Sequence, residues 1–111
     1  MLPIAQLEYL DESGRSPFGR WRAGLDDVAR ERVTRALTRL SLGNTSNVKG
    51  VGGGLSELRI DFGPGYRVYF GWDGKTVVIL LGGGAKKRQQ SDIEAARIRW
   101  LDYKARKQQG E

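Results

Sequence analysis

Three strand-like runs follow one another in the second half of the chain, with only short turns between them. The runs cover residues 55–62, 66–72 and 76–81. Gly63-Pro64-Gly65 separates the first two, and Asp73-Gly74, a pair typical of two-residue hairpins, separates the second from the third. This order predicts an antiparallel β-meander at the centre of the fold.

The last of these runs is apolar at every position after its first residue, Thr76. A strand with two apolar faces belongs in the middle of a sheet that is covered on both sides. Residues 3–10 alternate loosely between apolar and polar side chains, which predicts a first strand that pairs along the free edge of the last one. We therefore expect a mainly antiparallel four-stranded sheet in the order 1-4-3-2.

Two helices are predicted between the first strand and the meander. Ser16-Pro17 supplies an N-cap residue and a proline at the first helical position of a short helix that ends near Gly24. Asp26-Asp27 can cap a second helix, whose apolar stripe runs as far as Gly43-Asn44. The pair predicts a helical hairpin.

A C-terminal helix is predicted from the capping box in residues 91–94, with serine at the N-cap and glutamate at N3. It should fray from about residue 104, where the apolar content falls. Its docking face should consist of Ile93, Ala96, Trp100 and Tyr103. The expected fold class is α+β, with the element order β-αα-βββ-α in a single domain over residues 1–111.

The composition removes several kinds of chemistry. The 111 residues include no cysteine and no histidine, which excludes thiolate nucleophiles, histidine triads and metal sites built from Cys or His. No carboxylate cluster has metal-ligand spacing, and the glycine runs match neither dinucleotide-binding nor P-loop templates, so we expect no metal or other cofactor. Any acid–base chemistry must use Asp, Glu, Lys, Arg, Tyr or Ser.

The charge balance points to a polyanionic partner. The chain has 19 Lys and Arg residues and 13 Asp and Glu residues, which gives a net charge of +6. The longest apolar run, residues 77–81, is far shorter than the roughly 20 residues that span a bilayer. The first residues also lack the pattern of a signal peptide, so a cytoplasmic protein is expected.

The strand pairing predicts which side chains gather on one face. Pairing across the first turn places Arg59 opposite Tyr69 and Asp61 opposite Arg67. Arg59, Arg67 and Tyr69 then share a face, and the helical hairpin covers the other face, with Leu58. Arg67 opposite Asp61 is also compatible with an ordinary cross-strand ion pair, and Arg59 with a solvated surface.

Pairing across Asp73-Gly74 extends this expectation to the last strand. A two-residue turn there places Val78 beside Tyr69 and Leu80 beside Arg67. The last strand then leads through three glycines into a basic run, Lys86-Lys87-Arg88, next to the arginines. The run is also compatible with a plain solvated loop; if it joins the arginines, the result is a cationic groove.

Such a groove suits RNA chemistry. Guanidinium groups present a planar fork of donors to phosphate oxygens, and the 2′-hydroxyl of RNA attacks its own phosphate without a protein nucleophile. Arg59 and Arg67 are the candidate phosphate clamps. Lys86 or Lys87, crowded by like charge, is the candidate acid or base, and Tyr69 is a weaker one.

Three strings in the meander carry a family resemblance. GGGLSELRI at residues 52–60, GPGYRVYF at 63–70 and LGGG at 81–84 occur in this order, followed by Asp92-Ile93. The chain resembles the RelE/ParE superfamily of toxins from toxin–antitoxin modules. More narrowly, it is similar to the HigB-like, phage-derived addiction-module killer proteins.

The resemblance implies a compact RelE-like fold and an antitoxin partner, usually a small helix-turn-helix protein. For RelE and HigB relatives it also implies ribosome-dependent cleavage of mRNA. Arg67 matches the arginine of the family's Gly-Tyr-Arg strand, which is catalytic or clamps phosphate. Basic residues follow the last strand in relatives, as residues 86–88 do here. We expect Arg88, Lys49 and Arg97 to bind RNA phosphates.

Two other functions remain open at this stage. The superfamily contains ParE toxins, which inhibit DNA gyrase without cutting RNA. Some ribonuclease members carry a tyrosine or histidine near the start of the last helix, and no such residue lies between Arg88 and Arg97. A degenerate toxin that acts as a co-repressor with its antitoxin is the third reading.

Overall fold

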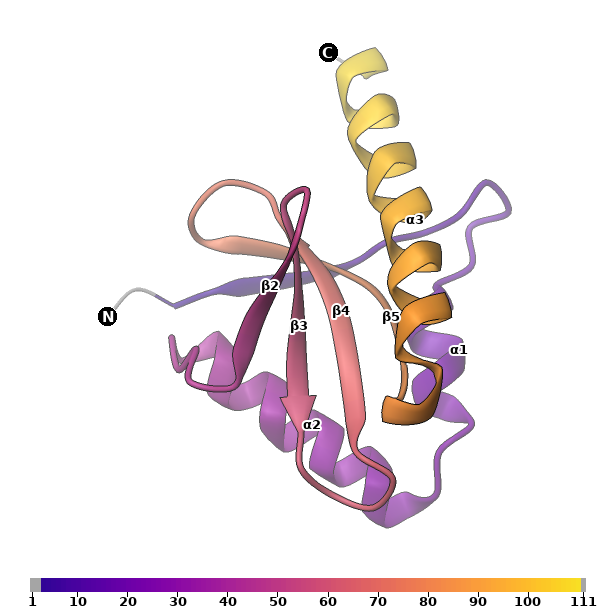
Figure 1. Cartoon of the computed structure of the whole chain (residues 1–111). Helices are drawn as coiled ribbons and strands as arrows, with labels where there is room; N and C mark the ends of the chain where they lie inside the picture. Colours follow the sequence, from indigo (N-terminus) through magenta and orange to yellow (C-terminus); the bar gives the residue numbers. More distant parts are fainter. Residues whose placement is uncertain (1–2, 111) are drawn as a thin grey trace.

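The predicted meander forms the centre of a larger sheet (Figure 1). In the computed structural model, which describes residues 3–110, β3 (Leu55–Ile60), β4 (Tyr66–Trp72) and β5 (Val77–Ala85) pair in antiparallel fashion. β1 (Ala5–Glu8) pairs with β5 in parallel, and β2 (Val48–Gly52) pairs with β3 in antiparallel fashion. The sheet is therefore mixed and has the order β1-β5-β4-β3-β2.

This corrects the prediction of a four-stranded sheet, although the fold class is α+β as expected. The four predicted strands lie in the predicted order, and β2 adds a fifth at the edge. Its sequence, VKGVG, contains two glycines in five residues. Glycine weakens strand propensity, which is why the pattern did not reveal this strand.

The helical hairpin follows the cap signals closely. α1 (Pro17–Ala23) begins after Ser16, whose hydroxyl accepts a hydrogen bond from the Gly19 amide at 2.9 Å. α2 (Asp27–Ser41) begins after Asp26, whose carboxylate accepts one from the Ala29 amide at 2.8 Å. α2 packs on one face of the sheet through Val33, Leu37 and Leu40. The strand residues in this core include Leu58, Ile60 and Val68.

The register between β3 and β4 differs from the predicted one by two residues. Arg59 pairs with Arg67, and Glu57 pairs with Tyr69, so Asp61 does not face Arg67 as predicted. Because side chains alternate with a period of two, this shift leaves every residue on its predicted face. Arg59, Arg67 and Tyr69 therefore still lie on the face opposite α2.

The register between β4 and β5 was predicted wrongly in a way that does change the face. Asp73 pairs with Val77 across a connection longer than a two-residue turn, and a bulge follows between Tyr69 and Phe70. As a result, Tyr69 pairs with Gly82, and Arg67 pairs with Gly84. Val78 and Leu80 lie in the core under α2, together with Phe70, instead of beside the arginines.

The basic run after β5 forms a short 3-10 turn, η1 (Lys86–Arg88), that leads directly into α3 (Gln89–Gln109). The helix thus begins before the predicted capping box. Ser91 is not the N-cap, because its hydroxyl donates to the Arg88 carbonyl at 3.1 Å from within the first turn.

The far end of α3 is tied to the rest of the fold. The helix includes the segment that was predicted to fray, as far as Gln109, and the Lys107 ammonium lies 2.7 Å from the Asp73 carboxylate. Glu111, the last residue of the predicted frayed tail, lies outside the described residues. No helix within residues 3–110 is long and apolar enough to cross a membrane.

α3 covers the second face of the sheet through the residues predicted for its docking face. Trp100, 5% exposed, lies flat against Gly71 of β4, where an added Cβ would meet the indole at 2.5 Å. The sheet therefore lies between α2 on one face and α3 on the other (Figure 1).

Candidate nucleic-acid interface

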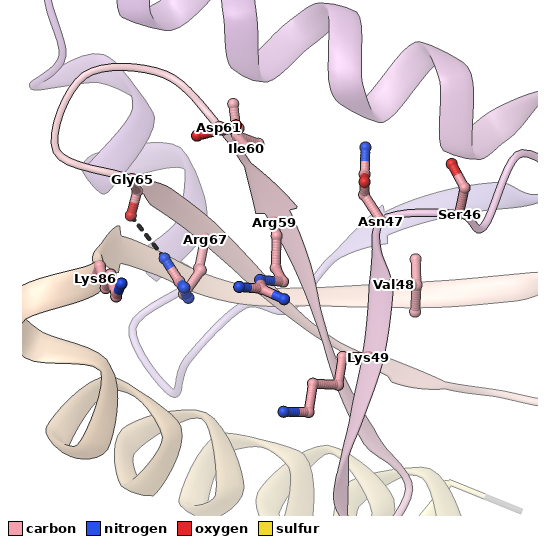
Figure 2. A pocket seen from close by; sticks show the side chains of 10 residues that line it. All are labelled: Ser46, Asn47, Val48, Lys49, Arg59, Ile60, Asp61, Gly65, Arg67 and Lys86. Carbon is pink, nitrogen blue, oxygen red and sulfur yellow. Dashed lines mark hydrogen bonds between the residues drawn. The ribbon is translucent and has the colours of Figure 1, made fainter.

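A cleft of about 350 Å³ opens where β2, β3 and β4 meet the end of β5 (Figure 2). It brings together four of the predicted site residues, one each from β2, β3, β4 and η1. The cationic residues of the lining are Lys49, Arg59, Arg67 and Lys86. The other residues that line it are Ser46, Asn47, Val48, Ile60, Asp61 and Gly65.

Arg67 lies at the floor of the cleft and is held on two sides. Its side chain extends from β4 and is 5% exposed. Nη1 donates to the Gly65 carbonyl at 2.9 Å, and Nε lies 3.6 Å from the Glu57 carboxylate. Nη2 makes no hydrogen bond with residues 3–110. The fork is thus fixed in place and keeps donor capacity for a ligand.

Glu57 is a site residue that sequence reasoning missed. It is 2% exposed, and its carboxylate accepts a hydrogen bond from Gln89 Nε2 at 2.9 Å. Glu57 is therefore not part of a solvated face, whereas Arg59, for which the sequence left a solvated surface open, is exposed. The only signal was alternation, which places Glu57 on the face that carries Arg67; the covering residue, Gln89, comes from α3.

One carbonyl links the two halves of the cleft. Gly65 O accepts from the Lys86 amide at 2.7 Å as well as from Arg67. Gly65 has a φ of +78°, in the left-handed region that favours glycine, which the tight turn between β3 and β4 requires. The turn therefore fixes Lys86 and Arg67 relative to each other.

Arg59 and Lys49 complete the cationic lining, and both are exposed. Figure 2 shows the Arg59 and Arg67 guanidinium groups side by side, as expected for directly paired residues. Like charges directly opposite each other destabilise a sheet. An anion between the two groups would relieve this repulsion.

Four other predicted site residues do not line the cleft. Lys87 and Arg88 are exposed on η1. Arg97 instead donates to the carbonyls of Val51 and Gly52, each at 3.3 Å, and so fixes the turn after β2. The fourth, Tyr69, lies beneath α3.

Tyr69 is 1% exposed, and its hydroxyl has no hydrogen-bond partner within residues 3–110. Burial raises the pKa of Tyr69 to about 12, and the carboxylates of Glu57 and Asp92 act in the same direction. The phenol is therefore protonated throughout the neutral range. It also does not line the cleft.

Replacing Tyr69 by phenylalanine tests whether this phenol takes part in chemistry. We expect the thermal midpoint of unfolding to stay unchanged or rise, because an unsatisfied buried hydroxyl costs about 1–3 kcal/mol. We also expect any RNA-cleaving activity to keep its rate–pH profile between about pH 6 and 10. A loss of activity in a stable Tyr69→Phe protein would restore Tyr69 as an acid candidate.

The fold and the cleft together define a small basic α+β protein whose sheet carries a cationic cleft beside its last helix. The chain belongs to the family described as Phage derived protein Gp49-like, whose sequence model matches residues 20–100. This family is associated with toxin–antitoxin modules.

An uncharacterized protein of Haemophilus influenzae is 40% identical to the chain over 82 residues. The matched region covers 73% of this chain and 83% of the relative. The region matched by the family, residues 20–100, contains every residue that lines the cleft.

Proposed function

We propose that the protein is the toxin of a type II toxin–antitoxin module, of the RelE/ParE kind, and that it cleaves mRNA on the ribosome without a metal ion. The association of the Gp49-like family with such modules supports the toxin role and implies an antitoxin partner. The chain's resemblance to HigB-like toxins implies that this antitoxin is a small helix-turn-helix protein.

The observation that carries the nuclease proposal is the direct pairing of Arg59 with Arg67 in a cleft. One of the two is buried against Glu57, and the other is exposed. Two arginines that served only solubility would not need to be paired directly, because direct pairing of like charges destabilises the sheet. A phosphodiester between the two forks accepts hydrogen bonds from both.

The chemistry that fits this cleft uses the RNA's own nucleophile. The 2′-oxygen attacks the adjacent phosphorus and loses its proton, the P–O5′ bond breaks, and the 5′-oxygen takes up a proton. The products are a 2′,3′-cyclic phosphate and a 5′-hydroxyl end. Arg59 and Arg67 stabilise the charge that gathers on the phosphoryl oxygens, and Lys86 is the cleft residue suited to proton transfer.

Transcripts recovered from cells that express the protein test this proposal. We expect cuts inside translated reading frames, with 5′-hydroxyl ends, in the wild type. Arg59→Ala should reduce cutting by roughly 10- to 150-fold, the equivalent of a lost hydrogen bond to a charged group, ~1.5–3 kcal/mol. Because Arg59 is exposed and its removal relieves the repulsion with Arg67, the thermal stability of this variant should equal or slightly exceed that of the wild type.

Arg20→Ala is the matched control, since it removes the same charge from an exposed position of α1 outside the cleft. Growth arrest with intact messages would contradict the nuclease proposal. Inhibition of purified gyrase in a supercoiling assay would then point to a ParE-like toxin. Harmless expression without an antitoxin would point to a co-repressor.

A further inference from the structure

A second groove opens beside the cleft, along α2. It has a volume of about 170 Å³ and shares part of its lining with the cleft: Asn47, Arg59, Ile60 and Asp61 line both. Figure 2 shows Asn47 and Asp61 on the side of the cleft that faces α2. The groove therefore continues the cleft around the end of β3 to the helix on the other face of the sheet.

Three further arginines line this groove. Arg32, Arg35 and Arg39 are exposed and follow one another on α2 at spacings of three and four residues. This spacing places them on one face of the helix, in a row that is about 10 Å long. We call these three residues the α2 arginine row.

The α2 arginine row is only weakly engaged by the protein itself. Arg35 pairs with Glu31 at 2.7 Å, but the two side chains are 51% and 66% exposed, so the pair exchanges readily with another anion. The Arg32 guanidinium lies 4.7 Å from the centre of the Phe62 ring. Arg39 forms no ion pair within residues 3–110.

The cleft and the groove together hold more positive charge than one phosphodiester requires. Four cations line the cleft, and the α2 arginine row adds three. Within residues 3–110, Asp61 is the only acidic residue that lines the cleft or the groove. One phosphate engages one or two guanidinium forks. The surplus fits a ligand with several phosphates in series, which is a strand rather than a mononucleotide.

We propose that the groove binds the backbone of single-stranded RNA that continues from the cleft, so that the α2 arginine row holds phosphates flanking the scissile one. This inference rests on the proposed function, because it takes the cleft as the site of cleavage. The row then sets affinity and strand direction without taking part in the reaction.

The lining favours an RNA backbone over an acidic protein. Protein interfaces have a buried apolar centre. Ile60 is 7% exposed at the base of the groove, and Arg32 lies over Phe62. The groove thus presents guanidinium groups and the Asn47 amide rather than apolar surface.

Binding of non-cleavable RNA tests the inference, with 2′-O-methyl oligouridines of 3 and 12 nucleotides as probes. In Arg35→Gln/Arg39→Gln, the slope of log K against log salt for the 12-mer should fall by about 1.4, which is about 0.7 for each lost phosphate contact. Binding of the 3-mer, which fills only the cleft, should not change. The matched control is Arg15→Gln/Arg20→Gln, which removes two exposed cations elsewhere.

Three results would overturn the inference. The double variant could bind the 12-mer with the wild-type slope, it could lose both oligonucleotides equally, or polyglutamate could compete with the 12-mer as well as RNA does, which would indicate an acidic protein partner. The proposed function fails separately: then the wild type neither cuts transcripts nor binds the 3-mer, whereas a failure of the groove alone leaves both intact.

Discussion

Replacing Arg67 by lysine is expected to reduce RNA cleavage by about 100- to 1,000-fold, which is the cost of removing one preorganised donor from a developing oxyanion. Lysine keeps the positive charge beside Glu57 but is a point charge on a flexible stem. All three of its donors sit on one nitrogen, so it lacks the second nitrogen that the guanidinium keeps for the proposed phosphate while Nη1 donates to Gly65. Single-turnover cleavage of a ribosome-bound message measures the effect.

Lysine is preferable to alanine at this position for a physical reason. Glu57 is 2% exposed, and removing its cationic neighbour leaves a buried carboxylate without compensation, at a cost of about 3–5 kcal/mol. Arg67→Ala would therefore confuse unfolding with lost catalysis. Thermal unfolding of Arg67→Lys should lie close to the wild type, with Arg20→Lys as the matched control. Cleavage at the wild-type rate in a folded Arg67→Lys protein would remove this arginine from the mechanism.

The strand order and the faces of β3 and β4 were predictable from the sequence, but the register of the strands was not. The turn at Gly63-Pro64-Gly65 was correctly placed, and its register was wrong by two residues, so Arg59 and Arg67 stayed on one face. At Asp73-Gly74 the longer connection shifted the pairing next to the turn by three residues, an odd number, so Val78 lies on the opposite face; the bulge between Tyr69 and Phe70 then shifted the rest of the pairing by one more residue. Local turn residues do not encode the bulge, which forms where the two strands meet.

The cleft could be predicted only as far as the strands define it. The sequence placed Arg59 and Arg67 together and brought Lys86 near them. It did not place Glu57 and Tyr69 beneath a helix, because alternation says which face a side chain shares and not what covers that face. The covering contacts, such as Gln89 with Glu57, join residues that are 32 positions apart.

The position of α3 is therefore the structural fact on which the cleft depends. Its first turn buries Glu57 through Gln89, and the 3-10 turn before it carries Lys86 to the cleft. The helix is held further along by Trp100, whose indole donates to the Gly53 carbonyl at 3.1 Å. Loss of this anchor should therefore affect the cleft as well as the core.

Replacing Trp100 by alanine is expected to lower the free energy of unfolding by about 3–5 kcal/mol, the usual cost of removing a buried Trp or Phe side chain. The indole is 5% exposed and stacks on Tyr103 with ring centres 5.5 Å apart. Gly71 has no side chain to fill the space that would be left. Urea unfolding gives the free energy, and the thermal midpoint should fall by more than about 10 °C.

Leu101→Ala is the matched control, because it shortens the next side chain of the same helix at a position that is 57% exposed. A surface change of this kind should stay within about 0.5 kcal/mol of the wild type. Equal losses in the two variants would mean that α3 docks through a different face. A small loss in Trp100→Ala alone would mean that the helix is held mainly by its ends, through Lys107 and Gln89, and that the cleft does not depend on the indole.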